Sequence, residues 1–373
     1  MPSPTLERLV AQFDRREQRT LPPISYRNTE ADRNVLRARI LEALELVESQ
    51  GLLERRDSTG RTLADSLILV AEEQFWDPFA LEPGRTRIFS ELVLNLSEPK
   101  RINQGLKGTC SAACIESYMA EREPAEYARI IAGLVTRDGL VTLETGGTLI
   151  CDEDVLAPNV HERGRNPVSR IFQAACMEFA YPNMHYDNVT DQHFNGDDMV
   201  GSGLEITAFV RLLTAVTGEN WKTISAAHSR MAQLFSSHGV NTEDFLDITR
   251  DGISIIDQST RQNEDVFVTL ELPSVPNPIP QGEPAVLYNM PHKVRAIAID
   301  WSAHEVHYDD PMDPSQPWFD GAEVTIHDLY GHCSMPIEDF AKLMTELSYR
   351  PEFFTREVVQ KRDQQAPAQP RTV

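Results

Sequence analysis

The sequence predicts an α+β fold, and three observations support this prediction. Segments with apolar residues at helical spacing fill most of the chain up to about residue 235. Short segments rich in β-branched and aromatic residues follow residue 260, and one more helical segment comes after them. Helices first and a meander of strands afterwards are typical of an α+β domain. The length of 373 residues allows one or two domains and a sizeable core.

Residues 1–98 are expected to form a helical N-terminal region. Residues 30–53 carry apolar side chains at helical spacing with Gly51 as a suitable stop, and residues 62–75 predict a second helix. The stretch "LPPISYRN" is expected to be an extended connector. The apolar faces of these helices need a surface to pack on, and the region that follows is the nearest one. We therefore expect residues 1–98 to pack stably on the rest of the protein.

Helices continue beyond residue 98, with one β-hairpin among them. One helix is expected from Thr109 to about Ala120, and another over residues 123–139, with Pro124 in its first turn and Gly139 at its end. The glycine-centred stretch "LVTLETGGTLICDED" predicts a hairpin. Three further helices are expected at "NPVSRIFQAACMEFA", at "LEITAFVRLLTAVTG", which Gly218 closes, and at "WKTISAAHSRMAQLF".

Strands dominate the prediction after residue 260. The expected strands are "DVFVTLEL", "PAVLYNM", "HKVRAIAI", "HEVHYD" and "AEVTIHDL". The segment "IEDFAKLMTELSY" is expected to be a helix that ends the fold. Residues 351–373 are expected to be a disordered tail, because "KRDQQAPAQPRTV" is polar and contains proline. Residues 99–350 then form the main domain.

The charge balance indicates which partners the chain avoids. Its 57 acidic and 35 basic residues give a formal net charge of -22, which argues against nucleic acid or an anionic membrane as the main partner. The N-terminus has no apolar signal segment, and no run of residues reaches transmembrane length. The five cysteines form no CxxC pair, so a zinc site of paired cysteines is not expected. A reducing, cytoplasmic setting fits best, and export without a cleaved signal stays open.

The stretch "NQGLKGTCSAAC" carries the candidate chemistry. Cys110 falls in the first turn of a predicted helix, with Thr109 as its candidate cap, and the positive end of a helix stabilises a thiolate. Gly105 and Gly108 would let the preceding loop approach a substrate backbone. Gln104 offers a side-chain N–H to the oxygen that becomes charged in a tetrahedral intermediate. The alternative interpretation is structural: a glycine loop before a helix that buries a small cysteine.

The segment "QGLKGTCSA" resembles the Gln-Gly-x-x-Gly-Ser/Thr-Cys-x-Ala segment of papain-like cysteine peptidases. The resemblance implies a papain-like fold in which a helical lobe carries the cysteine and an antiparallel sheet carries a histidine and an aspartate. It also implies that Cys110 is the nucleophile and Gln104 the oxyanion donor, with Gly105, Gly108 and Ser111 next to the substrate. Lys107 replaces a disulfide cysteine of papain, and Ser111 replaces a large residue, so kinship with papain itself is not close.

A histidine and two aspartates follow at a suitable distance along the chain. In "MPHKVRAIAIDWSAHEVHYDDPM", a hairpin centred on Trp301 would bring His292 opposite residues 309–310. The carboxylate there would hold the imidazole in place. The segment resembles the strand–His–strand–Asp-Pro pattern of the bacteriocin-processing branch of these peptidases, which implies Asp310 as the orienting residue. A register shift would select Asp309 instead.

Two other groups of residues are alternative candidates for a functional site. The segment 185–198 holds histidines and carboxylates that could bind a metal, although its glycine and asparagine favour a solvated acidic loop, which could flank the cleft. Its candidates are His185, Asp187, Asp191, His193, Asp197 and Asp198. His332 and Cys333 in "GHCSM" could suggest a second nucleophile, but the segment lacks a glutamine and a following helix start, and a turn is expected. Cys114 is expected to pack in the core.

These patterns together predict a cysteine-nucleophile hydrolase that cleaves an amide bond in a peptide or protein and needs no cofactor or metal. A glutamine deamidase or transglutaminase-like enzyme acting on another protein would use the same residues. A degenerate papain-like module kept for binding is the third interpretation. No pattern in the sequence indicates the oligomeric state.

Overall fold

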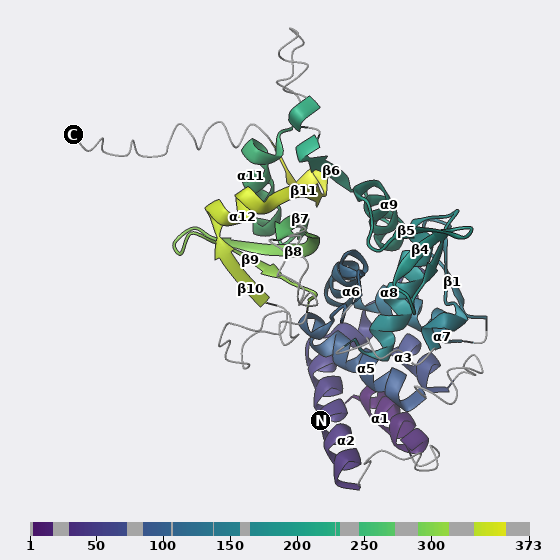
Figure 1. The fold of residues 1–373 in the computed structure, drawn as a ribbon. Helices are drawn as coiled ribbons and strands as arrows, with labels where there is room; N and C mark the ends of the chain where they lie inside the picture. Colours follow the sequence, from purple (N-terminus) through teal and green to yellow (C-terminus); the bar gives the residue numbers. More distant parts are fainter. Residues whose placement is uncertain are drawn as a thin grey trace, which may run out of the picture. The chain divides into compact units, whose positions relative to one another are not determined.

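The computed structural model describes residues 3–17, 30–72, 85–105, 107–136, 138–156, 165–227, 229–231, 246–272, 290–312 and 332–355. The chain divides into two compact units (Figure 1). The first unit is Met1–Gly218 with Asp310–Gly331, and the second is Glu219–Asp309 with His332–Val373. Both contain helices and antiparallel strands, which agrees with the predicted α+β class.

The first unit is mainly helical. Its helices are α1 (Pro4–Glu17), α2 (Glu30–Ser49), α3 (Leu63–Glu72), α5 (Arg85–Ser97), α6 (Cys110–Arg122), α7 (Pro124–Val135), α8 (Pro167–Ala180) and α9 (Ile206–Thr217). Short 3-10 turns lie at Leu52–Glu54, Pro99–Arg101 and Glu153–Leu156. Two small antiparallel sheets complete the unit: β1 (Leu140–Thr142) with β2 (Thr148–Ile150), and β3 (His185–Asp187), β4 (Gln192–Asn195) and β5 (Asp198–Gly201) in that order.

The N-terminal helices pack against the helices that follow them, as expected. Helix α3 lies against α7, and α5 lies against both α6 and α8. Polar contacts reinforce this packing, because Ser58 Oγ donates to Glu126 Oε2 at 2.9 Å and Arg55 Nη2 donates to the Arg122 carbonyl at 2.8 Å. Helices α1 and α5 were not predicted individually. Residues 1–98 therefore share one unit with α6 to α9.

Several predicted elements of this unit are confirmed. Helix α6 begins at Cys110, α7 begins at Pro124, and the hairpin forms with Val141 opposite Leu149. Helix α9 ends at Gly218, whose φ of 71° is the left-handed conformation that glycine adopts without strain. Cys114 is buried in the core, at 2% exposure, as expected.

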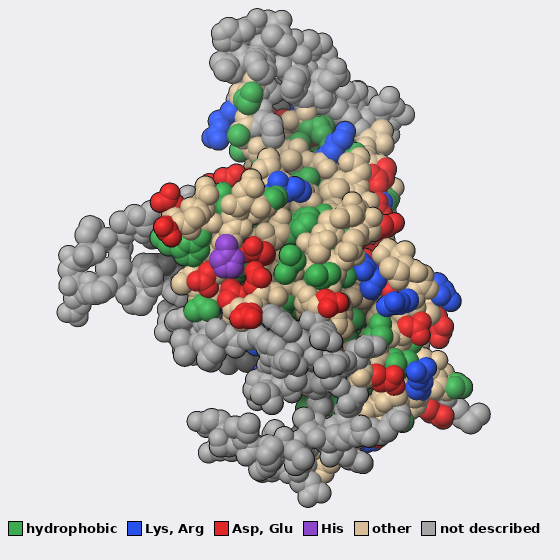
Figure 2. Space-filling view, turned by 90° about the vertical axis from the view of Figure 1, so that its right-hand side faces the viewer, with side chains coloured by type: hydrophobic (Ala, Val, Ile, Leu, Met, Phe, Trp, Pro, Cys, Tyr) green, Lys and Arg blue, Asp and Glu red, His purple; other side chains and the backbone are tan. Residues whose placement is uncertain are grey.

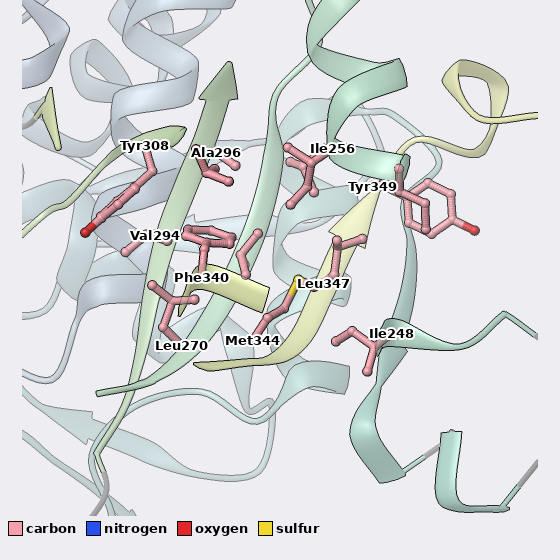
Figure 3. Packing of buried hydrophobic residues seen from close by; sticks show 14 of the residues in the cluster. Ile248, Ile256, Leu270, Val294, Ala296, Tyr308, Phe340, Met344, Leu347 and Tyr349 are labelled. Carbon is pink, nitrogen blue, oxygen red and sulfur yellow. The ribbon is translucent and has the colours of Figure 1, made fainter. Parts of the chain in front are cut away.

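The second unit is built on one antiparallel sheet with strand order β10-β9-β8-β7-β11-β6. The strands are β6 (Lys222–Ser225), β7 (Val266–Leu272), β8 (Met290–Asp300), β9 (Glu305–Asp309), β10 (His332–Pro336) and β11 (Met344–Tyr349), and the helices are α11 (Ile248–Arg261) and α12 (Ile337–Leu343). A short 3-10 turn spans Pro351–Phe353. Figure 3 shows the core, in which Ile256 of α11 and Phe340 of α12 meet Leu270, Val294 and Leu347 of the strands.

Three predictions for this unit are wrong, and one helix was missed. Residues 222–225 form β6 although a helix was expected there, and the predicted helix 337–349 stops at Leu343 so that residues 344–349 form β11. The pairing of β11 with β6 on one edge and with β7 on the other outweighs the helical propensity of its Met, Glu and Leu residues. Residues 332–336 form β10 instead of a turn, and α11 was not predicted.

Some predictions lie outside the described residues. They concern the connector 21–28, most of the strand 284–290, the strand 322–329 and the tail beyond residue 355. Within the described part of the chain, none of the helices combines the length and the apolar character needed to cross a membrane.

Candidate functional site

Cys110 is the first residue of α6, and its side chain is partly exposed. The next ten residues, 111–120, are all buried, so the cysteine lies where a buried helix reaches the surface. The backbone N–H groups of the first turn and the helix dipole favour a negative charge at this position. Thr109 occupies the cap position but makes no capping bond, and its hydroxyl donates to Gln173 Oε1 at 2.7 Å. The prediction that Thr109 is the cap residue is confirmed in position, but the capping hydrogen bond is absent.

Gln104 lies in the loop before Cys110 and is 5% exposed. Its backbone N–H donates to the Pro311 carbonyl at 2.8 Å, and its side-chain Nε2 donates to the Lys107 carbonyl at 2.7 Å. Because an amide nitrogen carries two hydrogens, the second one stays available for another acceptor. The buried Oε1 has no hydrogen-bond partner among the described residues, and such a group in a native structure deserves a functional explanation.

The loop between Gln104 and Cys110 is fastened to the β3–β4 turn. Lys107 is 3% exposed, and its ammonium donates to the carbonyls of Asn188 (2.7 Å) and Val189 (3.1 Å). The backbone N–H of Gly108 donates to Asp191 Oδ2 at 2.7 Å, while Tyr186 Oη donates to Asp191 Oδ1 at 2.7 Å. Lys107 thus links two segments of the chain without a disulfide.

The protein's own packing explains one of the two loop glycines. A Cβ at Gly108 would lie 2.8 Å from Ser202 Cβ, so the missing side chain makes room for Ser202. Gly105 has a φ of 61°, which favours glycine at this turn. Ser111 is 3% exposed, and its expected place next to a substrate stays a prediction. Of the residues expected next to a substrate, Gly105 and Gly108 lie in the loop itself.

The segment 185–198 is not a solvated loop throughout. It forms β3, β4 and the start of β5, and His193 is only 1% exposed between the rings of Tyr181 and Tyr186, whose centroids lie 4.8 and 5.0 Å away. Burial lowers the pKa of His193, which favours the neutral imidazole. The segment instead supports the Cys110 loop through Asp191 and the carbonyls of its turn.

Acidic side chains gather beside a histidine on the face that Figure 2 shows. Within the described residues, Asp152, Glu178 and His185 could each offer one ligand atom to a metal ion. His185 Nδ1 lies 3.2 Å from Glu178 Oε2 and 3.8 Å from Asp152 Oδ2. Glu178 also accepts the backbone N–H of Tyr186 at 2.6 Å. Clusters of exposed acidic groups such as this one are common on proteins that bind no metal.

His292 belongs to the second unit, where it lies near the start of β8, opposite Leu270 of β7, at 4% exposure. The predicted register of the β8–β9 hairpin is wrong, because Asp309 lies opposite Arg295 and not opposite His292. The turn spans residues 301–304, and a bulge lies between Ala296 and Ala298. Both features shift the pairing away from a hairpin centred on Trp301.

Asp309 forms an ion pair with Arg295. The Arg295 guanidinium, 1% exposed, contacts Asp309 through Nη2 and donates to Asp265 Oδ2 through Nη1 at 2.8 Å. Residues 292 and 295 are separated by an odd number of positions along a regular strand, so their side chains point to opposite faces of the sheet. Asp309 therefore faces away from His292. Asp310 belongs to the first unit, as Gln104 does, and accepts the Met312 N–H on Oδ1 at 2.8 Å.

A buried carboxylate that was not predicted from the sequence lies on the same helix as Cys110. Glu116 is 0% exposed and accepts from Tyr127 Oη (2.7 Å), Ser169 Oγ (2.9 Å), Gln173 Nε2 (2.9 Å) and Asn95 Nδ2 (3.4 Å). Burial raises the pKa of Glu116 from 4.5 to about 7, and the donors oppose that rise. The signal in the sequence was one charged residue inside the otherwise uncharged run "CSAACIESYMA".

The raised pKa of Glu116 predicts a pH-dependent stability. The pKa of Glu116 is about 7 in the folded protein and 4.5 as the ordinary value. Protonated Glu116 therefore contributes its full stabilisation below about pH 4.5, and this contribution to the free energy of unfolding is lost as the pH rises through about 7. A rise from 4.5 to about 7 corresponds to about 3 kcal/mol. We expect the free energy of unfolding of wild type, relative to that of Glu116→Gln, to fall by about 2–3 kcal/mol between about pH 5 and pH 8 in urea titrations. An unchanged difference would contradict this assignment.

Comparison with family models, with curated proteins and with solved structures found no match. The interpretation of the site therefore rests on its own residues and their contacts.

Proposed function

We propose that the protein is a papain-like cysteine enzyme that cleaves an amide bond in a peptide or protein substrate. Cys110 is the nucleophile, His292 its base, Asp310 the orienting carboxylate and Gln104 the oxyanion donor. The observation that carries the proposal is the loop–helix junction: a partly exposed thiol at the first position of α6, and six residues earlier an amide whose Nε2 is held by the Lys107 carbonyl. The antiparallel sheet that carries His292 supports the same assignment.

The reaction proceeds in two steps. His292 takes the thiol proton, the sulfur attacks the amide carbonyl carbon, and Gln104 donates its second N–H to the developing oxyanion. The tetrahedral intermediate collapses with cleavage of the C–N bond, and His292 gives its proton to the departing amine. Water then attacks the thioester, with His292 accepting a proton from it, so that the acid leaves and the thiol is restored.

The contacts of Asp309 support Asp310 as the orienting residue. Because Asp309 pairs with buried Arg295, we expect Asp309→Asn to lower the melting temperature and to leave the reactivity of the Cys110 thiol almost unchanged. We expect Asp310→Asn to slow turnover, but less than His292→Ala, because a carboxamide can still hold an imidazole. Rates and melting curves of the three variants would check both statements. A larger loss of turnover in Asp309→Asn than in Asp310→Asn would reverse the assignment.

One experiment tests the proposal and separates its alternatives. Wild type is incubated with a peptide library rich in internal glutamine, and the products are weighed by mass spectrometry. Amide cleavage gives two fragments whose masses add up to the peptide plus water, whereas a deamidase gives an intact peptide in which an amide has become an acid. We expect fragments. Intact peptides bound in stoichiometric amounts without any change of mass would favour a binding module.

A further inference from the structure

Gln173 makes hydrogen bonds to the residues that immediately precede Gln104 and Cys110, two of the residues that carry the proposed function. It lies on α8 and is 0% exposed. Its Nε2 donates to the Asn103 carbonyl at 3.0 Å and to Glu116 Oε2 at 2.9 Å, while its Oε1 accepts from Thr109 Oγ1 at 2.7 Å. Asn103 immediately precedes Gln104, and Thr109 immediately precedes Cys110.

The buried carboxylate of Glu116 fixes which way the Gln173 amide faces. The nitrogen of the amide must point at the two acceptors, Glu116 and the Asn103 carbonyl, and the oxygen must point at the Thr109 hydroxyl. A flipped amide would bring its oxygen against two acceptors. The other donors to Glu116 come from α5, α7 and α8, so its place in the core is held from several sides.

The hydroxyl of Thr109 is not used for helix stability. A threonine at a helix cap usually accepts a backbone N–H of the first turn, which stabilises the helix. Here the hydroxyl makes no capping bond, and it donates to Gln173. The Gln173 amide therefore bonds to both ends of the loop 103–109. The distance between the proposed oxyanion donor and the proposed nucleophile depends on the conformation of this loop.

We propose that Gln173, oriented by Glu116, is a positioning residue that sets the spacing between the Cys110 thiol and the Gln104 amide. This inference rests on the proposed function of these two residues. Small displacements of reacting groups lower rates by large factors, about a hundredfold for 1 Å. The bond from Thr109 is the part of this network that a conservative substitution can remove, because valine has the shape of threonine without its hydroxyl.

The test compares two reagents that modify Cys110. A peptidyl chloromethyl ketone presents a carbonyl oxygen that needs oxyanion donors, whereas iodoacetamide requires only a reactive thiol. The readout is the ratio of the two second-order rate constants, with the adduct mapped to its residue by mass spectrometry. We expect Thr109→Val to lower this ratio by about tenfold or more and Thr109→Ser to restore it, because serine keeps the hydroxyl.

Controls separate positioning from a general loss of stability. Thr136→Val makes the same substitution at the end of α7, where the hydroxyl bonds to the Gly133 carbonyl of its own helix and to no other group in the described part of the chain, and we expect it to leave the ratio unchanged. Glu116→Gln should lower the ratio as Thr109→Val does, and the double variant should be no worse than the single variants. A wild-type ratio in folded Thr109→Val would overturn the inference while the proposed function stands. A wild-type protein whose ratio is no higher than that of a small free thiol would refute the proposed function itself, and the inference with it.

Discussion

Cys110→Ala is expected to lower the cleavage rate of any peptide that the wild type cleaves by at least about a thousandfold. In the proposed mechanism the thiolate forms the bond to the substrate carbonyl, and alanine has no nucleophilic atom that could do so. The fold should survive, because the side chain is small and only partly buried at the first position of α6. The measurement is the cleavage rate at equal concentrations of folded protein, verified by circular dichroism.

Cys333→Ala is the matched control for this variant. Cys333 is also a partly exposed cysteine, but it lies on β10 and packs against the core of the second unit. We expect Cys333→Ala to retain the wild-type rate. Full activity in Cys110→Ala would remove the cysteine mechanism altogether, and a comparable loss in both variants would point to a structural cause.

Arg295→Met is expected to lower the free energy of unfolding of the second unit by about 3–5 kcal/mol. Arg295 and Asp265 are both 1% exposed in their side chains, and Asp309, 12% exposed, shares the same guanidinium. Removing the cation leaves these carboxylates buried without their positive partner, and this penalty exceeds the value of the lost contact. Urea unfolding followed by fluorescence and circular dichroism would measure it.

A surface ion pair on the same unit serves as the comparison. Lys342 and Asp339 lie on α12 with side chains 73% and 57% exposed, and Lys342 Nζ is 2.9 Å from Asp339 Oδ1. We expect Lys342→Met to leave the free energy of unfolding almost unchanged, because solvent screens such a pair. Equal changes in the free energy of unfolding for the two substitutions would contradict the claim that the burial of the Arg295 ion pairs makes their loss costly.

Helices with clear periodicity and good end signals were the most predictable part of the fold. Pro124 at the start of α7 and Gly218 after α9 fixed those ends, because both residues have restricted or special backbone conformations. Helix α1 carries the same kind of signal in Leu6, Leu9 and Phe13, all of them buried, so it could also have been predicted.

The errors lie where distant segments decide the structure. The local propensity of residues 344–349 favours a helix, but they form strand β11 because β6 and β7 pair with them on either side. The register of the β8–β9 hairpin depends on a bulge between Ala296 and Ala298 that nothing in the local sequence indicates. A shift of a few residues was enough to move Asp309 away from His292.

The candidate site divides in the same way. Gln104 and Cys110 could be identified because they lie six residues apart in one short motif. The groups that hold them come from other parts of the chain: Gln173 from α8, Asp191 from the β3–β4 turn and Glu116 from the interior of α6. Their roles follow from three-dimensional contacts, and no spacing in the sequence predicts such contacts.

Alkylation of Cys110 by iodoacetamide at about pH 6 tests the central claim most directly. A free thiol with the ordinary pKa of about 8.5 is almost fully protonated there and reacts slowly. If His292 supports a thiolate at Cys110, the wild type should be modified at this residue at least about tenfold faster than a small free thiol, and His292→Ala should remove that advantage. Equal rates for wild type, His292→Ala and the free thiol would contradict the assignment of Cys110 as an activated nucleophile.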